Sequence, residues 1–109
     1  MKFYADVHRT KKNSGRYGIT YSTDGTTFKH VDSLGEFPAG PGDRLLMDTI
    51  PPQHTEGAIE LLREGVEVNY LRRLTLLEKI RGELKLPKSD RGDIKALMSI
   101  EERWFRRVT

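Results

Sequence analysis

Three strand-like runs in the first third of the chain restrict its fold most strongly. Residues 2–8 place Phe, Ala and Val at every second position, which is typical of a strand with one buried face. Residues 16–22 and 26–32 are also strand-like, and the Asp24-Gly25 pair between them is a good hairpin signal. The first third is therefore predicted to be a three-stranded antiparallel meander.

The middle of the chain predicts a strand, a helix and a further strand. Residues 43–50 form a short apolar run suited to a buried strand, which Pro51-Pro52 ends. Residues 55–64 carry apolar side chains at helical spacing, and residues 66–71 are again strand-like. A meander followed by this crossover predicts a mixed α/β sheet in which the first and fourth strands are parallel neighbours.

The last third predicts helices. Residues 72–84 have an amphipathic pattern, and Pro87 separates them from a second helix that begins near Asp90. A capping-box pattern at residues 99–102 predicts that a further helix starts there, after the one that begins near Asp90. The apolar stripe of that helix would consist of Ile100, Trp104 and Val108.

Composition excludes several classes of protein. The 109 residues suffice for one domain, residues 1–109, with a modest core. Cysteine is absent, so disulfide frameworks and thiolate zinc sites are excluded. No apolar run approaches the ~20 residues of a membrane span, and no signal peptide is visible, so we expect a cytoplasmic protein that does not contact membranes. The net charge of +3 is compatible with a nucleic-acid partner.

Four aspartates stand out from this background. Asp6 and Asp48 lie inside otherwise apolar strands, where Asp is depleted and where an ionised carboxylate must be paired or bind a metal. Asp90 and Asp93 are three residues apart at the start of a predicted helix, which places them on one face of its first turn. Metal binding is one interpretation of this second pair. The other is that both acids favour a helix N-terminus without binding anything.

The motifs around these acids resemble those of a known family. FYADVH, LLMDTIPP, ELLREGVEVNYL and above all KSDRGDIKAL (residues 88–97) resemble the N-terminal RuvC-like domain of the DEDD-type insertion-sequence transposases, the bridge-RNA-guided recombinase family. The resemblance covers roughly residues 2–98. It implies an RNase H-like fold and a role in transposition and DNA recombination.

The resemblance also implies a chemistry. Asp6, Asp48, Asp90 and Asp93 correspond to the family's four metal ligands, which are also its catalytic residues. Hard Mg²⁺ or Mn²⁺ prefers such carboxylate oxygens. Two such ions ~4 Å apart would activate the attacking oxygen and stabilise the leaving oxygen of a phosphodiester. The implied partner is DNA, with or without a guide RNA.

Some features depart from the family pattern. The family has Glu where this chain has Asp48, and residues 33–43 leave little room for the family's helix between the third and fourth strands. The family continues into a coiled-coil insertion and a second domain with a nucleophilic serine. On this resemblance we expect the RNase H-like domain to be truncated on its C-terminal side.

Basic residues supply candidate contacts to nucleic acid. Six of them flank the predicted strand ends or the helix that carries Asp90 and could hold phosphates. These candidates are Arg9, Lys11, Lys12, Arg16, Lys88 and Arg91. The alternative for the basic hairpin is a merely solvated face.

Other basic and aromatic residues allow two interpretations. Arg72 and Arg73, and the segment 103–107, could also contact nucleic acid. In the competing interpretation Trp104 packs inward, and Phe105 marks a homodimer surface.

The histidines give no metal-binding signal. His8 shares the predicted face of Asp6, so one interpretation is that it assists the site, but a surface histidine at a strand end is the favoured interpretation. His30 and His54 have no ligand-like spacing and are interpreted as surface residues.

Three functions therefore stay open. The leading one is a metal-dependent nuclease or transposase-like domain, which requires the four carboxylates to converge. The second is a non-catalytic nucleic-acid-binding or homo-oligomerisation module on the same scaffold, which predicts that the acids are spread apart. The third is an ordinary α/β domain in which the acids only cap helices and face solvent.

Overall fold

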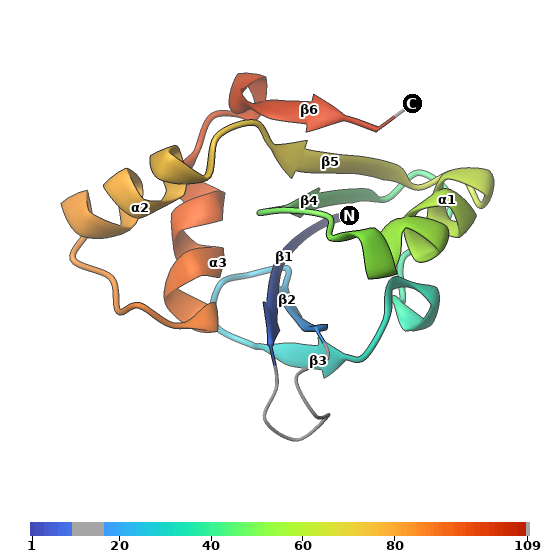
Figure 1. The fold of residues 1–109 in the computed structure, drawn as a ribbon, viewed down its shortest axis with the longest axis horizontal. Helices are drawn as coiled ribbons and strands as arrows, with labels where there is room; N and C mark the ends of the chain where they lie inside the picture. Colours follow the sequence, from blue (N-terminus) through green and yellow to red (C-terminus); the bar gives the residue numbers. More distant parts are fainter. Residues whose placement is uncertain (10–16, 109) are drawn as a thin grey trace.

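The computed structural model describes residues 1–9 and 17–108, and these residues form a mixed six-stranded sheet with three α-helices (Figure 1). The strand order is β3-β2-β1-β4-β5-β6. The strands are β1 (Lys2–Arg9), β2 (Tyr17–Ser22), β3 (Lys29–Val31), β4 (Arg44–Met47), β5 (Glu67–Leu71) and β6 (Phe105–Arg107). The helices are α1 (Thr55–Arg63), α2 (Leu74–Glu83) and α3 (Asp90–Ser99), with 3₁₀ turns η2 (Leu34–Glu36), η3 (Pro52–His54) and η4 (Glu102–Trp104).

The predicted meander and crossover are both confirmed. β2 is antiparallel to β1 and to β3, whereas β1 and β4 are parallel neighbours, as are β4 and β5. The Asp24 carboxylate holds the β2–β3 turn by accepting hydrogen bonds from the backbone N–H groups of Thr26 and Thr27, both at 2.8 Å. Gly25 follows with φ +79°, a conformation that glycine adopts without strain. The α/β class is therefore confirmed.

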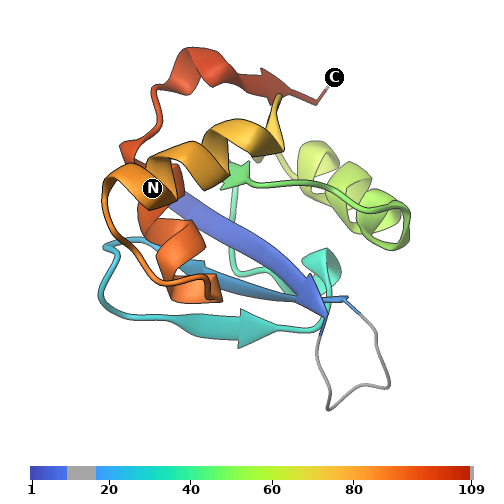
Figure 2. The same ribbon diagram turned by 60° about the vertical axis from the view of Figure 1, so that its left-hand side comes forward.

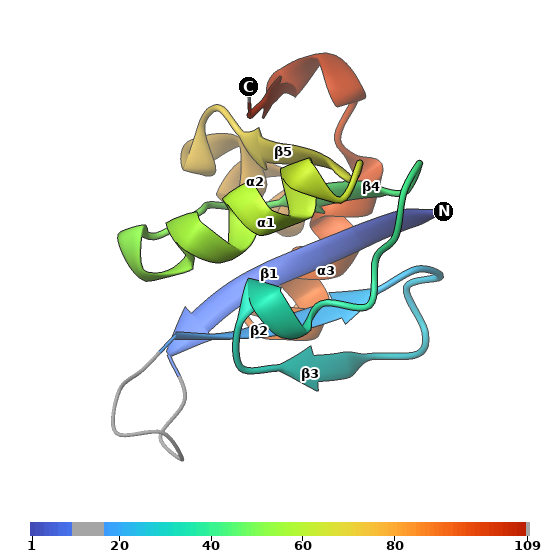
Figure 3. The ribbon, with the colours of Figure 1, turned by 90° about the vertical axis from the view of Figure 1, so that its right-hand side faces the viewer.

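The sheet is covered on both faces. Figure 3 shows α1 in front of the sheet and α2 and α3 behind it, and Figure 2 shows α2 and α3 together on their own side. Alternation along β1 sends Phe3, Ala5 and Val7 into the α1-side core. Tyr4 packs against the α2/α3-side core instead. That second core consists of Leu46, Leu71, Leu77, Ala96, Leu97, Ile100 and Phe105.

The C-terminal segment differs from the prediction. Residues 100–108 form η4 and β6 rather than a helix, so the expected helical stripe is wrong. Ser99 is the last residue of α3 and cannot start a new helix, and Ile100 is already extended. The unpaired edge of β5 supplies backbone partners for the segment, and Phe105 pairs with Leu71. Phe105 is consequently buried at 9% exposure, whereas Trp104 is 36% exposed, the reverse of the expected packing.

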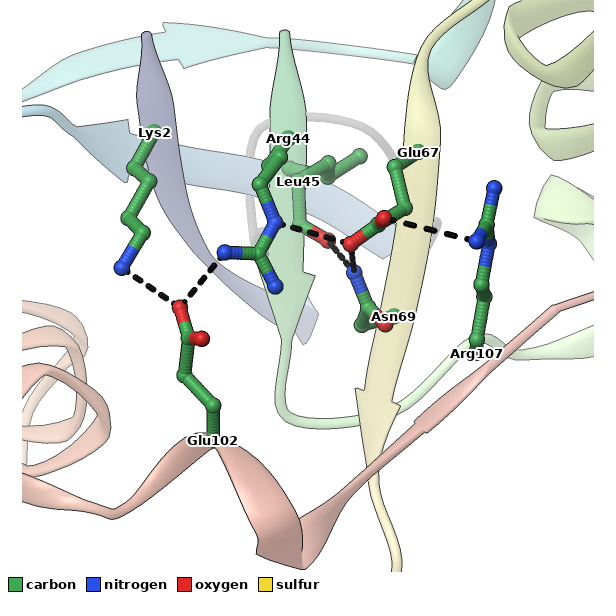
Figure 4. A network of polar contacts seen from close by, with 7 residues as sticks. All are labelled: Lys2, Arg44, Leu45, Glu67, Asn69, Glu102 and Arg107. Atoms are coloured by element: carbon green, nitrogen blue, oxygen red, sulfur yellow. Dashed lines mark hydrogen bonds and ion pairs between the residues drawn. The ribbon is translucent and has the colours of Figure 1, made fainter.

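A network of charged side chains ties β6 and η4 to the sheet (Figure 4). The Glu102 carboxylate lies 2.5 Å from the Lys2 ammonium and 2.8 Å from the Arg44 guanidinium. Arg44 also donates to Glu67 at 2.8 Å, and Arg107 of β6 lies 3.6 Å from the same carboxylate. These contacts join β1, β4, β5 and β6 at the end of the sheet where β1 begins. In the described part of the chain, no helix is both long and apolar enough to cross a membrane.

Candidate functional site

Asp6 and Asp48 lie side by side on the sheet face that α3 covers. In the parallel register of β1 and β4, Tyr4 is opposite Leu46 and Ala5 is opposite Met47, so the aspartates are the next residues along the two strands. Asp6 is 2% exposed and Asp48 is 7% exposed, and their carboxyl groups are hydrogen-bonded to each other. The Val7 backbone N–H also donates to Asp48 Oδ1 at 3.1 Å. Two buried acids in contact can share a proton or bind a cation.

The electrostatics of the pair follow from this burial. Burial raises the pKa of Asp6 to about 11, with further increases from Asp48, Asp93 and Asp90. Burial also raises the pKa of Asp48, to about 6, although hydrogen bonds from Asp6 and from the Val7 N–H oppose the rise. Asp6 therefore keeps its proton at neutral pH when no cation is present, and it donates that proton to Asp48.

The start of α3 brings the second pair of acids to the same place. The Ser89 hydroxyl caps the helix by accepting from the Gly92 N–H at 3.2 Å, so Asp90 and Asp93 occupy the first turn without serving as the cap. Gly92 is required here because a Cβ on it would lie 1.9 Å from the Pro87 carbonyl oxygen. The first turn of α3 therefore lies close against residue 87, and it reaches β1, where His8 contacts Asp90.

Two residues that the sequence interpretation did not assign to the site hold these acids. His8 Nε2 lies 3.3 Å from Asp90 Oδ2 and 2.8 Å from Thr20 Oγ1. The Arg81 guanidinium of α2 forms an ion pair with Asp93, and both side chains are largely buried. The sequence signal for His8 is its alternation with Asp6 on one face of the first strand, which the sequence analysis noted but did not favour. Arg81 could have been found as a cation at an apolar-stripe position of residues 72–84.

The four predicted acids thus lie at one end of the sheet but make different contacts. Asp6 and Asp48 contact each other, while Asp90 faces His8 and Asp93 faces Arg81. Asp90 and Asp93 are close enough to Asp6 to raise its pKa. Within residues 1–9 and 17–108, no three or more acids and histidines are grouped so that they could hold a metal ion in this arrangement.

The basic candidates are only partly described. Lys88 and Arg91 are exposed beside the start of α3, and the Arg91 guanidinium lies 5.1 Å from the centre of the Phe28 ring. The side chain of Arg9 and all of Lys11, Lys12 and Arg16 lie outside the described residues.

The remaining histidines differ in environment. His30 is exposed, as expected, and its ring nitrogen lies 3.2 Å from Asp32. The prediction of a surface His54 is wrong, because η3 turns this side chain into the protein and leaves it 4% exposed.

Comparison of the chain with protein-family models, with curated proteins and with solved structures finds no match.

Proposed function

We propose that this chain is a metal-dependent nucleic-acid-processing domain of RNase H-like fold, related to the RuvC-like domain of DEDD-type transposases. In this proposal Asp6, Asp48, Asp90 and Asp93 hold Mg²⁺ or Mn²⁺ against a phosphodiester of DNA. The observation that carries the proposal is the buried Asp6–Asp48 pair, because two carboxyl groups in contact inside an apolar sheet are costly unless a proton or a cation lies between them.

The strand arrangement supports the same proposal. A three-stranded antiparallel meander followed by a parallel strand–helix–strand unit is what the RNase H-like resemblance implies. The carboxyl ends of the parallel strands β4 and β5 meet at one edge of the sheet, which is where sites form in open α/β sheets. Asp48 follows β4 at that edge.

The donor atoms fit a hard divalent cation. All four side chains offer carboxylate oxygens, the ligands that Mg²⁺ and Mn²⁺ prefer. Asp6 and Asp48 are the core of the candidate site, since their buried carboxylates would hold the cation in place of the proton that they share. When bound, the metal would supply Lewis-acid stabilisation of the phosphodiester oxygens.

The other residues of the site have separable tasks. Asp90 and Asp93 would complete the ligand set after Asp90 gives up its contact with His8 and Asp93 gives up its ion pair with Arg81. His8 is positioned to orient the Asp90 carboxylate, since its Nε2 lies 3.3 Å from Asp90 Oδ2. Arg81 would then be free to meet a phosphate oxygen with its planar fork of N–H donors.

A second function is favoured by a specific observation. Arg81 already neutralises Asp93, and His8 already contacts Asp90, so two of the four acids have partners without metal. This arrangement suits a non-catalytic nucleic-acid-binding or assembly module on the same scaffold. In that case the Asp6–Asp48 pair would share a proton permanently.

Calorimetric titration with Mn²⁺ and Mg²⁺ separates the two functions. We expect binding to the intact chain, and we expect both Asp6→Asn and Asp90→Asn to abolish it. Glu78→Gln, which removes an exposed carboxylate from α2, is the matched control and should leave binding unchanged. Absence of binding at millimolar metal would overturn the enzymatic proposal and favour the module. A metal-dependent cleavage assay on labelled DNA with the same variants then tests the activity itself.

A further inference from the structure

A cleft rich in arginine lies beyond the end of β5, outside the carboxylate site. It has a volume of about 230 Å³ and is lined by Tyr70, Arg72, Arg73 and Arg106, which we call the arginine cleft. Pairing of β5 with β6 builds it by placing Tyr70 opposite Arg106. The Arg72 N–H also donates to the Trp104 carbonyl at 3.1 Å. The fold thus joins two basic segments that are far apart in the sequence.

The charges of this cleft are not compensated within the described protein. Arg72, Arg73 and Arg106 are exposed, and none of the ion pairs among the described residues involves them. Other arginines behave differently, since Arg44 and Arg107 both pair with Glu67. Three guanidinium groups around one hollow raise the local positive potential and fit an anion with several oxygens.

An exposed aromatic ring lies next to the cleft. A second hollow of about 230 Å³ shares Arg73 with the arginine cleft and is also lined by Lys79 and Trp104. Trp104 is 36% exposed, and the Arg103 guanidinium lies 5.1 Å from the centre of its ring. Cations beside a partly exposed indole are the pairing that single-stranded nucleic acid uses, with phosphates on the cations and bases stacked on the ring.

The cleft is distinct from the carboxylate site but close to it. Tyr70 is opposite Met47, the residue before Asp48, so both sites lie where β4 and β5 end. Tyr70 shares the sheet face of Val68, on the α1 side, whereas Asp48 shares the face of Leu46, on the α3 side. A strand bound in the cleft would therefore pass around the end of β5.

We propose that the arginine cleft and Trp104 form a binding site for single-stranded nucleic acid, which acts without metal. The arginines hold successive phosphates, and Trp104 stacks on one base. This inference shares its ligand class with the proposed function but not its residues, so either can fail alone. An acidic peptide would satisfy the arginines but would gain nothing from the indole ring.

The only tryptophan of the chain makes the test direct. Fluorescence of Trp104 is titrated in EDTA with a 20-nucleotide oligothymidylate, with polyphosphate and with polyglutamate, over a range of salt concentrations. We expect saturable quenching by the oligonucleotide, and quenching by neither of the other polyanions. Arg72→Ser combined with Arg106→Ser should lower the slope of log affinity against log salt by about 1.4, since each single-strand phosphate contact contributes about 0.7.

Two further variants complete the design. Arg63→Ser removes one guanidinium charge from the exposed end of α1, outside the cleft, and should leave the salt slope and the quenching unchanged. Trp104→Ala, followed by anisotropy of a labelled oligonucleotide, should weaken binding by about fivefold or more. Equal losses in the Arg63 variant, or binding of polyglutamate as tight as that of the oligonucleotide, would overturn the proposal. Circular dichroism verifies that each variant is folded.

Discussion

Replacing Asp6 by Asn tests whether the buried acid pair is as the structure describes it. The amide keeps the size of the side chain and can still donate a hydrogen bond to Asp48, as the protonated carboxyl does. The substitution removes only the ability of this side chain to gain and lose a proton. The wild-type Asp6 pKa is raised from 3.8 to about 11 by burial and by three neighbouring acids, so the folded protein holds a proton there that the unfolded chain releases.

The sign and size of the effect follow from this proton. Between pH 5 and pH 8 the folded state binds one proton more than the unfolded state, so the free energy of unfolding falls as pH rises. The slope is about 1.4 kcal/mol per pH unit for one proton, which amounts to about 4 kcal/mol over three units. The amide at position 6 can still donate a hydrogen bond to Asp48, so the hydrogen bond that lowers the pKa of Asp48 is kept in the variant. The Asn variant should therefore gain about 4 kcal/mol relative to wild type from pH 5 to pH 8.

Urea unfolding in EDTA at pH 5, 6, 7 and 8 measures this difference. Glu78→Gln serves as the control for loss of one exposed carboxylate and should parallel wild type. Parallel curves for wild type and Asp6→Asn would refute the reasoning, because they would mean that Asp6 carries no extra proton in the folded state. Addition of Mg²⁺ at pH 8 should stabilise wild type and leave the Asn variant unchanged, since a bound ligand stabilises only the state that binds it.

The remaining predictions concern the support of the site. Gly92→Ala should destabilise the fold by about 2 kcal/mol, because the added Cβ would lie 1.9 Å from the Pro87 carbonyl oxygen and must displace the start of α3. Thermal unfolding measures this loss, and an unchanged melting temperature would contradict the close approach. Arg81→Gln leaves the largely buried Asp93 carboxylate without its cation and should cost about 3 kcal/mol in EDTA. In titrations the same variant should bind Mn²⁺ more tightly than wild type, whereas weaker binding would show that Arg81 supports the ligand set rather than competes with it.

Local patterns were enough to predict most of the sheet and all three α-helices. The signals are short-range ones: alternation in residues 2–8 predicts a strand, the Asp24-Gly25 pair predicts a hairpin turn, and helical spacing in residues 55–64 predicts the crossover helix. The C-terminal segment could not be predicted in this way. A capping-box pattern favours a helix locally, but pairing with the free edge of β5 and burial of Phe105 outweigh that preference.

In the candidate site, too, local patterns predicted some residues and tertiary packing decided others. Its strand acids could be identified because Asp6 interrupts an apolar strand and Asp48 directly follows the apolar run of β4, where a buried charge is costly whatever the fold. Their partners could not, because His8 reaches Asp90 and Arg81 reaches Asp93 only after β1, α2 and α3 have packed together. The arginine cleft likewise exists only because β6 docks on β5.

The sequence alone therefore determined the strand order of the meander, the crossover and the identity of the acids, since these depend on neighbours within a few residues of the chain. Tertiary structure decided which cation or proton each acid meets, where Trp104 and Phe105 point, and that two distant basic segments share one cleft. The partners and orientations of these side chains depend on burial and pairing between residues that are remote in the chain, and a local sequence pattern does not specify them.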